Sequence, residues 1–172
     1  MTTGRDEDDR VSTLQGYGIL DTPNEIQFDS IVRDAAKALG SPIALISLVD
    51  DNRQWFKAKV GLEPNETPRS ISFCTHAIRG PEVMVVNDAT QDKRFVDNPL
   101  VTGDPNIRFY AGAPLKTENG RRIGTLCVLD STAREGGISE KDRATLESLA
   151  RRTMAALELR KLSNEQAAAL VK

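Results

Sequence analysis

Hydrophobic positions along this chain follow a helical period in some stretches and a strand period in others. Between Thr22 and Gly40, apolar residues recur every three or four positions, which is typical of a helix with one buried face. Thr22 can cap the first turn, Pro23 suits the first helical position, and Glu25 completes a capping box. Gly40 supplies the left-handed residue that commonly ends a helix. The pattern predicts a helix over this stretch that covers a sheet.

Five stretches with strand-like composition predict an antiparallel sheet: 43–49, 56–60, 83–86, 107–116 and 122–129. The first stretch is apolar on both alternating faces, which indicates a central strand covered on both sides. Lys57 and Lys59 alternate with apolar residues in the second stretch and place it nearer an edge. Asn119-Gly120, between the last two stretches, is a strong signal for a hairpin turn.

Two further helices and a long connection complete the predicted elements. Ser72 can cap a short helix that runs to Arg79, and Ser139 can cap a long terminal helix. The long helix has an apolar stripe formed by Leu146, Leu149, Ala150, Thr153 and Leu157. The connection from Asp88 to Asn106 is longer than most connections in a compact domain, as expected of a lid or a binding loop.

Three parts are predicted along the chain. Residues 1–13 are predicted to be a charged, disordered tail, because Met1 to Arg10 shows no apolar periodicity. Residues 14–162 are predicted to form one domain, since 39% hydrophobic residues in a chain of 172 suffice for one core. Residues 163–172 are alanine-rich and are predicted to be a C-terminal helical extension.

Charge and composition exclude several classes of function. With 23 Lys and Arg against 25 Asp and Glu, the net charge is -2, so the chain lacks the positive surface that binds nucleic acid. Its apolar runs are far shorter than the roughly 20 residues of a membrane span, and its charged start is unlike a signal sequence. We therefore expect a cytoplasmic protein with neither a membrane nor a nucleic acid as partner. A single histidine and two widely separated cysteines predict no metal site.

The predicted elements form an α+β arrangement, and six stretches carry a family resemblance. These stretches are Ile19-Leu20-Asp21-Thr22-Pro23, 42–50, Arg53-Gln54-Trp55-Phe56, Ser72-Phe73-Cys74-Thr75-His76-Ala77-Ile78, 108–115 and 124–130. They resemble the GAF sensor domains found N-terminal to bacterial sensor histidine kinases and diguanylate cyclases. The resemblance implies a GAF-like antiparallel sheet of five or six strands, with the terminal helices on one face. It also implies a short helix plus a loop over a pocket on the other face.

Cys74 and His76 are the first candidates for chemistry, as a thiol and its base. Residues two apart on a helix point about 200° away from each other, so the predicted short helix keeps the two side chains from a direct hydrogen bond. Alternatively, Cys74 is a small core residue or a redox-sensitive thiol near a helix start, and His76 is a packed or capping residue. Cys127 lies in an apolar strand and is predicted to be an inert core thiol.

The residues predicted to meet a ligand, in the pocket that the resemblance implies, are Cys74, His76, Asp88, Phe95, Asn98, Arg108 and Tyr110. Arg108 and Tyr110 share one face of a strand, where a guanidinium and a phenol can hold an anion or a planar ring. Asp88, Phe95 and Asn98 lie on or beside the long loop, where polar groups beside an apolar cavity orient a small molecule.

Three of these candidates also have structural interpretations that the sequence leaves open. Tyr110 can be a core residue with a satisfied hydroxyl, and Arg108 can pair with Asp88 or Asp92 to hold the loop. Asn98 precedes a proline and is equally at home as a turn residue.

Comparison with the motifs of GAF subfamilies argues against two classes of ligand and does not identify the ligand. The chain has no Cys-His dipeptide for a covalent bilin, and it lacks the Asn-Lys-x-x-x-Phe-Asp-Glu signature of cyclic-nucleotide-binding relatives. The main hypothesis is a non-enzymatic sensory module, with no cofactor named, that binds an unidentified small molecule. It signals through its terminal helices as a homodimer.

Two other hypotheses remain. One is a cysteine-dependent reductase of the free methionine sulfoxide reductase type, put in doubt by the presence of only two cysteines. The other is a pure dimerisation scaffold with a collapsed pocket. The last ten residues are too short to fold as an output domain. We therefore expect either a stand-alone sensor that acts on an effector protein in trans, or a fragment whose helix continues into an effector.

Overall fold

The computed structural model describes residues 4–171, and a six-stranded antiparallel sheet forms the centre of this part of the chain. The strands are β1 (Ile43–Val49), β2 (Arg53–Val60), β3 (Glu66–Pro68), β4 (Met84–Val86), β5 (Phe109–Lys116) and β6 (Arg122–Asp130). Their spatial order is β3-β2-β1-β6-β5-β4, which places the apolar strand β1 and its neighbour β6 at the centre. This α+β architecture confirms the predicted fold class. The short edge strand β3 lies where the sequence predicts only a loop.

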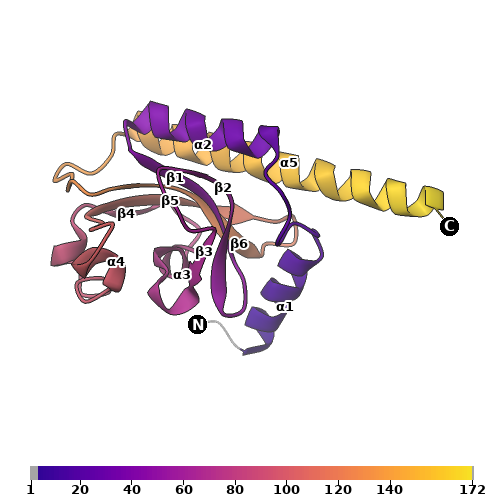
Figure 1. Cartoon of the computed structure of the whole chain (residues 1–172), viewed down its shortest axis with the longest axis horizontal. Coiled ribbons are helices and arrows are strands. Elements are labelled where there is room, and N and C mark those ends of the chain that lie inside the picture. Colours follow the sequence, from indigo (N-terminus) through magenta and orange to yellow (C-terminus); the bar gives the residue numbers. More distant parts are fainter. Residues whose placement is uncertain (1–3, 172) are drawn as a thin grey trace.

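Two long helices cover one face of the sheet. α2 (Ile26–Leu39) and α5 (Glu140–Val171) lie side by side above the strands in Figure 1. The predicted apolar face of α2 is buried, and Gly40 ends the helix with a positive φ of 58° as expected. Ser139 caps α5 by accepting a hydrogen bond from the amide of Asp142 at 3.0 Å. The helix layer therefore follows directly from the sequence pattern.

The opposite face of the sheet carries shorter elements. α3 (Phe73–Ala77), α4 (Pro99–Thr102) and the 3₁₀ turns η1 (Arg69–Ile71) and η2 (Ala89–Gln91) pack there. In Figure 1, α3 and α4 lie on the side of the sheet away from α2 and α5. Ser72 caps α3 as predicted, because its hydroxyl accepts from the amide of Thr75 at 3.1 Å. Buried apolar residues form one cluster on each face, so the sheet is covered on both sides.

The predicted disordered tail is wrong for the residues that the structure describes. α1 (Gly4–Gln15) is a helix of which Arg10 and Leu14 are buried, while residues 1–3 of the predicted tail lie outside the described residues. Arg10 donates to the carbonyl oxygen of Val49 at 2.6 Å and to both carboxylate oxygens of Glu7. The contact with Val49 is long-range, and the local polar composition of the segment does not reveal it.

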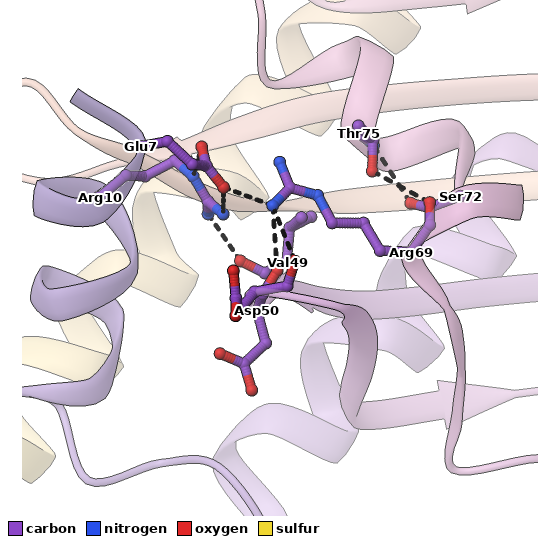
Figure 2. A network of polar contacts seen from close by, with 8 residues as sticks. Glu7, Arg10, Val49, Asp50, Arg69, Ser72 and Thr75 are labelled. Carbon is purple, nitrogen blue, oxygen red and sulfur yellow. Dashed lines mark hydrogen bonds and ion pairs between the residues drawn. The ribbon is translucent and has the colours of Figure 1, made fainter. Parts of the chain in front are cut away.

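Glu7 connects α1 to the segment that leads into α3 (Figure 2). Its carboxylate accepts from the guanidinium of Arg10, which lies on its own helix, and from that of Arg69 at the start of η1. Arg69 also donates to the carbonyl oxygens of Asp50 and Asp51 at 3.3 and 3.2 Å. The Glu7–Arg69 ion pair thus joins α1 to the approach to α3, and Arg69 extends the connection to the β1–β2 turn.

The start of α2 also differs from the prediction. The helix begins at Ile26, its N-cap residue Glu25 makes no side-chain cap bond, and the Thr22 hydroxyl donates to the carbonyl oxygen of Ile19. Glu25 instead accepts from the buried ammonium of Lys57 on β2 and from Arg160 on α5. The predicted capping box fails because these partners from β2 and α5 engage the carboxylate.

The last half of α5 runs past the rest of the fold. The buried residues of the helix are Leu146, Ala150, Thr153 and Leu157, and none follows them up to Val171. Figure 1 shows this C-terminal half extending beyond the sheet. The helix continues without a break through residues 163–171 of the predicted extension.

Candidate functional site

A cavity of about 360 Å³ lies between the sheet and the short elements that cover its second face. Alternate residues of β1, β2, β5 and β6 form its floor, because only every second side chain of a strand points to this face. Its walls come from α3, from residues 61–67 and from residues 100–107. The lining residues are mostly apolar: Ile43, Leu45, Gln54, Phe56, Gly61, Leu62, Glu63, Pro64, Thr67, Phe73, Cys74, Leu100, Asp104, Pro105, Ile107, Tyr110, Cys127 and Leu129.

Three polar side chains, of which Tyr110 and Cys74 line the cavity, meet beside its floor. The Tyr110 hydroxyl donates to the sulfur of Cys74 at 3.3 Å and lies 3.5 Å from the hydroxyl of Thr125. The Cys74 sulfur is 3.1 Å from the same Thr125 hydroxyl. The three residues come from β5, α3 and β6. The contact therefore ties α3, which with residues 100–107 forms the cover of the cavity, to strands β5 and β6.

The two cysteines have opposite acid–base character in this cluster. Burial opposes ionisation of Cys74, but hydrogen bonds from Cys127, Thr125 and Tyr110 outweigh it and lower the pKa of the Cys74 thiol to about 6. Burial raises the pKa of Cys127 well above its ordinary value, and the neighbouring Cys74 raises it further. The pKa of Tyr110 is also raised, chiefly by burial. Of Cys74, Cys127 and Tyr110, Cys74 is thus the group that ionises most readily.

Gln54 anchors a second polar contact at the cavity. Its side-chain oxygen accepts from the hydroxyls of Ser47 at 3.1 Å and Ser72 at 2.8 Å, and its amide nitrogen donates to Thr67 at 2.6 Å. Ser72 is the N-cap of α3, so Gln54 connects β1 and β2 to the start of that helix. The amide is buried, and these contacts satisfy it.

Of the predicted ligand-binding residues, Cys74 and Tyr110 lie in the cavity wall. Phe95 is buried behind the wall, with its ring stacked on that of Phe73 at a centroid distance of 4.1 Å. Asp88 caps η2 by accepting from the amide and hydroxyl of Thr90, and these bonds lower the pKa of its carboxyl. The structure therefore places Phe95 and Asp88 in supporting positions beside the cavity.

Asn98, Arg108 and His76 also lie outside the cavity lining. Asn98 caps α4 and donates to the carbonyl oxygen of Ile71 at 3.0 Å, so it joins the two ends of the cover. Arg108 donates to the carbonyl oxygens of Val101 and Ile107 at 2.8 and 3.0 Å. It holds the loop as one alternative predicted, but through carbonyl groups in place of an aspartate. Ligand contact by these three residues stays a prediction.

The proposed thiol–base pair of Cys74 and His76 does not form. The Cys74 sulfur faces the sheet, whereas the Nδ1 of His76 contacts the guanidinium of Arg79 at 3.4 Å, and its ring packs edge-on against Phe95. Partial burial lowers the pKa of His76, and the nearby Arg79 and Arg94 lower it further. The separation follows from the two-residue spacing on a helix, as expected.

Sequence reasoning missed several cavity residues, chiefly Gln54, Glu63 and Asp104. Gln54 shares a strand face with Phe56, and this alternation along β2 was a signal that could have identified it. Glu63 and Asp104 lie in loops without periodicity, so no sequence pattern indicates that they lie at the same cavity mouth.

Two more open hollows lie around Arg69 and Arg79, near α1 and the outer side of α3. Their volumes, about 570 and 680 Å³, exceed that of the cavity, but they are less enclosed and more polar. Several of their charged groups already pair with each other, as Glu7 does with Arg69. The cavity beneath α3, which is more enclosed and more apolar than these hollows, has the character expected of a small-molecule site.

Comparison with known proteins agrees with this fold. The model of the GAF domain family matches residues 24–157, and the chain belongs to this family, whose sensory and regulatory character it shares. A cyclic di-GMP phosphodiesterase from Pseudomonas aeruginosa is 46% identical over 159 residues. The match covers 92% of this chain but 27% of that protein, so this chain spans about a quarter of its relative. The predicted association with histidine kinases and diguanylate cyclases stays a prediction.

Solved structures of low sequence identity share the fold. The GAF domain of an Acinetobacter phosphoenolpyruvate-protein phosphotransferase has a TM-score of 0.63 at 18% identity, covering 91% of this chain and 95% of that one. A free methionine-R-sulfoxide reductase from Neisseria meningitidis, solved with its substrate, has a TM-score of 0.60 at 20% identity. The coverage there is 90% of this chain and 88% of the reductase. At these identities the likeness concerns the fold alone.

Residues 4–171 contain neither a candidate metal cluster nor a helix able to cross a membrane. In this range, no group of three or more His, Cys, Asp or Glu side chains is placed to hold a metal ion. None of the helices in the same range combines the length and the apolar character needed to cross a membrane.

Proposed function

We propose that this chain is a non-enzymatic sensory module that binds a small molecule in the cavity and signals through its helices. The observation that carries this proposal is the partly enclosed, mostly apolar cavity of about 360 Å³ beneath α3 and the 100–107 segment. Its volume lies in the range typical of small-molecule sites. A few polar groups on its floor, including Tyr110 and Cys74, can orient a ligand.

The central strands can carry the signal from the cavity to the helix layer. Cys127 of β6 lines the cavity, while its neighbours Leu126 and Val128 belong to the apolar cluster under α2 and α5. A ligand that favours one position of the cover shifts β6 and β1 toward the arrangement that fits it. Because α5 packs on β6 and its neighbour β5, and α2 packs on β1, the shift changes how these two helices lie on the sheet.

A homodimer would pass this change to another protein through the exposed half of α5. Leu159 and Leu162 are 67% and 54% exposed, and Leu170 and Val171 are 87% exposed. A second copy packed along α5 would bury such side chains, in keeping with the self-complementary contacts of twofold dimers. We expect an effector protein to be controlled through this helix, in the cytoplasm.

Ligand binding is tested by closing the cavity and measuring thermal stability with candidate metabolites. Leu62→Trp fills the mouth from a partly exposed lining position, and Leu20→Trp is a matched control beneath the helix layer. A metabolite that raises the melting temperature of the wild type and the control, but not of Leu62→Trp, supports the proposal. Native mass spectrometry of freshly purified protein shows any retained molecule. A cavity that binds nothing would instead favour the dimerisation scaffold.

A second candidate, a thiol-dependent reductase, is favoured by one observation. Cys74 lies in the cavity wall, and its pKa is lowered to about 6. A free methionine-R-sulfoxide reductase also shares the fold. Thiol-dependent reduction of free methionine sulfoxide that is lost in Cys74→Ser would establish this activity. Absence of turnover in the wild type would dismiss it.

A further inference from the structure

We propose that the cavity selects a small organic cation, with an apolar body and an amine head, over neutral or anionic molecules of the same shape. This inference rests on the proposed function, because it names the class of ligand that the cavity takes. Among the described residues that line it, two are acidic, Glu63 and Asp104, and none is a lysine, an arginine or a histidine. Both acidic residues are exposed, which places them at the mouth.

Two cations that contact residues of the lining or its flanks, Lys59 and Arg108, are turned to backbone partners. Lys59 donates to the carbonyl oxygens of Glu63 and Pro64 from outside the lining. Arg108 uses its guanidinium on the carbonyl oxygens of Val101 and Ile107, behind the opposite wall. Each cation therefore stabilises a loop backbone, and the carboxylates of Glu63 and Asp104 remain the charged groups of the lining.

The interior of the cavity also favours a positive head group. Phe56, Phe73 and Tyr110 contribute aromatic rings to the wall, and a cation within about 6 Å of such a ring is attracted by its π-electrons. The Cys74 thiol of α3, whose pKa is lowered, is a third group in the lining that can carry negative charge. An anionic ligand would meet no compensating cation here and would lose its hydration without replacement.

The size of the cavity supports a small ligand. About 360 Å³ lies near the lower end of the range for ligand pockets. A cyclic dinucleotide is large and carries two phosphates, so both its size and its charge oppose binding in this cavity. The nucleotide in the name of the Pseudomonas aeruginosa relative is therefore a suitable negative probe for this site.

The test uses three probes that share one carbon body and differ in charge: 3-phenylpropylamine, 3-phenylpropanol and 3-phenylpropionate. Their dissociation constants are measured on the full chain by calorimetry at neutral pH. We expect the amine to bind at least about tenfold more tightly than the alcohol, and the carboxylate to bind most weakly. Leu62→Trp should abolish binding of all three, which locates them in the cavity.

Variants of the two acidic residues at the mouth test whether the affinity for the amine depends on its charge or only on its shape. Asp104→Asn and Glu63→Gln should each weaken the amine about twofold to fivefold and leave the alcohol unchanged. Glu140→Gln is the control, because it removes one exposed carboxylate at the start of α5, in the helix layer on the face of the sheet opposite the cavity. The two carboxylates lie in exposed loops, so these changes are expected to leave the fold intact.

The outcomes distinguish this inference from the proposed function. Equal affinities for amine and alcohol, or tightest binding of the carboxylate or of cyclic di-GMP, overturn the choice of a cation and leave a small-molecule site in place. An effect of Glu140→Gln as large as that of Asp104→Asn also overturns it. If no probe binds and no molecule is retained in native mass spectrometry, the inference and the proposed function both fail.

Discussion

The hydroxyl of Tyr110 lies where a side chain at Gly112 would begin. The two residues are neighbours on the same face of β5, and a Cβ atom at position 112 would lie 2.3 Å from the Tyr110 oxygen and 2.7 Å from Cζ. The phenol therefore crosses the glycine to reach Cys74 and Thr125. The position of the Tyr110 ring on the cavity floor therefore requires a glycine at position 112.

Gly112→Ala is expected to destabilise the protein by about 2 kcal/mol, because the buried Tyr110 ring must leave its place in a filled core. Urea denaturation measures the change. Gly136→Ala is the control, since a Cβ there meets nothing within 4 Å.

A double-mutant cycle tests whether Tyr110 is the cause of that loss. In a Tyr110→Leu background, the cost of Gly112→Ala should fall by more than half, because the clashing atoms are gone. Equal cost in both backgrounds would mean that the strand backbone, and not the phenol, rejects the methyl group.

Cys74 is expected to react with iodoacetamide before Cys127 in the folded protein. Its pKa is lowered to about 6, whereas that of Cys127 is raised, and the thiolate is the reactive form. The rate at Cys74 should rise with pH, reach half its maximum near pH 6 and level off above it. Peptide mapping by mass spectrometry identifies the labelled residue, with Cys74→Ser as control. Faster labelling of Cys127 would contradict this order.

Glu7 is expected to make stability depend on pH in the acid range. The pKa of its carboxyl is lowered from 4.5 to about 2, most strongly by Arg10, with burial opposing the change and Arg69 adding to it. Because the folded-state pKa is the lower one, this stabilisation is complete above pH 4.5 and is lost as the pH falls toward 2.

Glu7→Gln measures that contribution. Urea denaturation should show the variant to be less stable by about 1 kcal/mol at pH 6, the upper end for a partly exposed ion pair. The difference between wild type and variant should shrink as the pH approaches 2. Asp8→Asn removes a charge from an exposed position on the same helix and should change little. A difference that stays constant from pH 6 to pH 2 would rule out titration of Glu7 as the source.

Glu25→Gln is expected to cost about 3 kcal/mol, because it leaves the ammonium of Lys57 buried without its charged partner. The Lys57 side chain is fully buried, and its other partners are the Thr22 hydroxyl and the Pro23 carbonyl oxygen. Asp21→Asn provides the comparison, since it removes a carboxylate from an exposed ion pair and should cost under about 1 kcal/mol.

Removing the buried charge should relieve part of the cost of Glu25→Gln. The double variant Lys57→Met with Glu25→Gln is therefore expected to be more stable than Glu25→Gln alone, as measured by urea denaturation. If the double variant is less stable than the single one, the ammonium is not the source of the loss.

The exposed leucines of α5 are expected to hold a homodimer together. Leu159→Glu combined with Leu162→Glu should shift the molecular mass seen in sedimentation equilibrium from dimer to monomer. Ala144→Glu adds charge at an exposed position nearer the start of the same helix and should leave the mass unchanged. A wild type that stays monomeric at all concentrations would remove the dimer from the proposed mechanism.

The predicted elements that the structure confirms rest on local patterns. Gly40 ends α2, Ser72 and Ser139 cap their helices, and Gly120 turns the β5–β6 hairpin with a φ of 82°. Each signal depends on backbone conformation or hydrogen bonding within a few residues. Such signals are readable without knowing what the rest of the chain does.

The wrong predictions share a different origin. The polar segment that forms α1 was predicted to be disordered, yet its order depends on Arg69 and Val49, far along the chain. Glu25 was predicted to complete a capping box, and Lys57 and Arg160 engage its carboxylate instead. Long-range charge pairs leave no periodic trace in a sequence.

The sequence by itself determined the α+β class, the two-sided sheet and the caps of α3 and α5, because burial periodicity and turn chemistry act over short distances. Only the tertiary structure decided which side chains share the cavity: it brought Cys74 to Tyr110 and turned Arg108 and Asn98 to backbone carbonyl groups. Cavity walls are assembled from loops and strands that meet in space, and the packing that selects them is absent from any single local pattern.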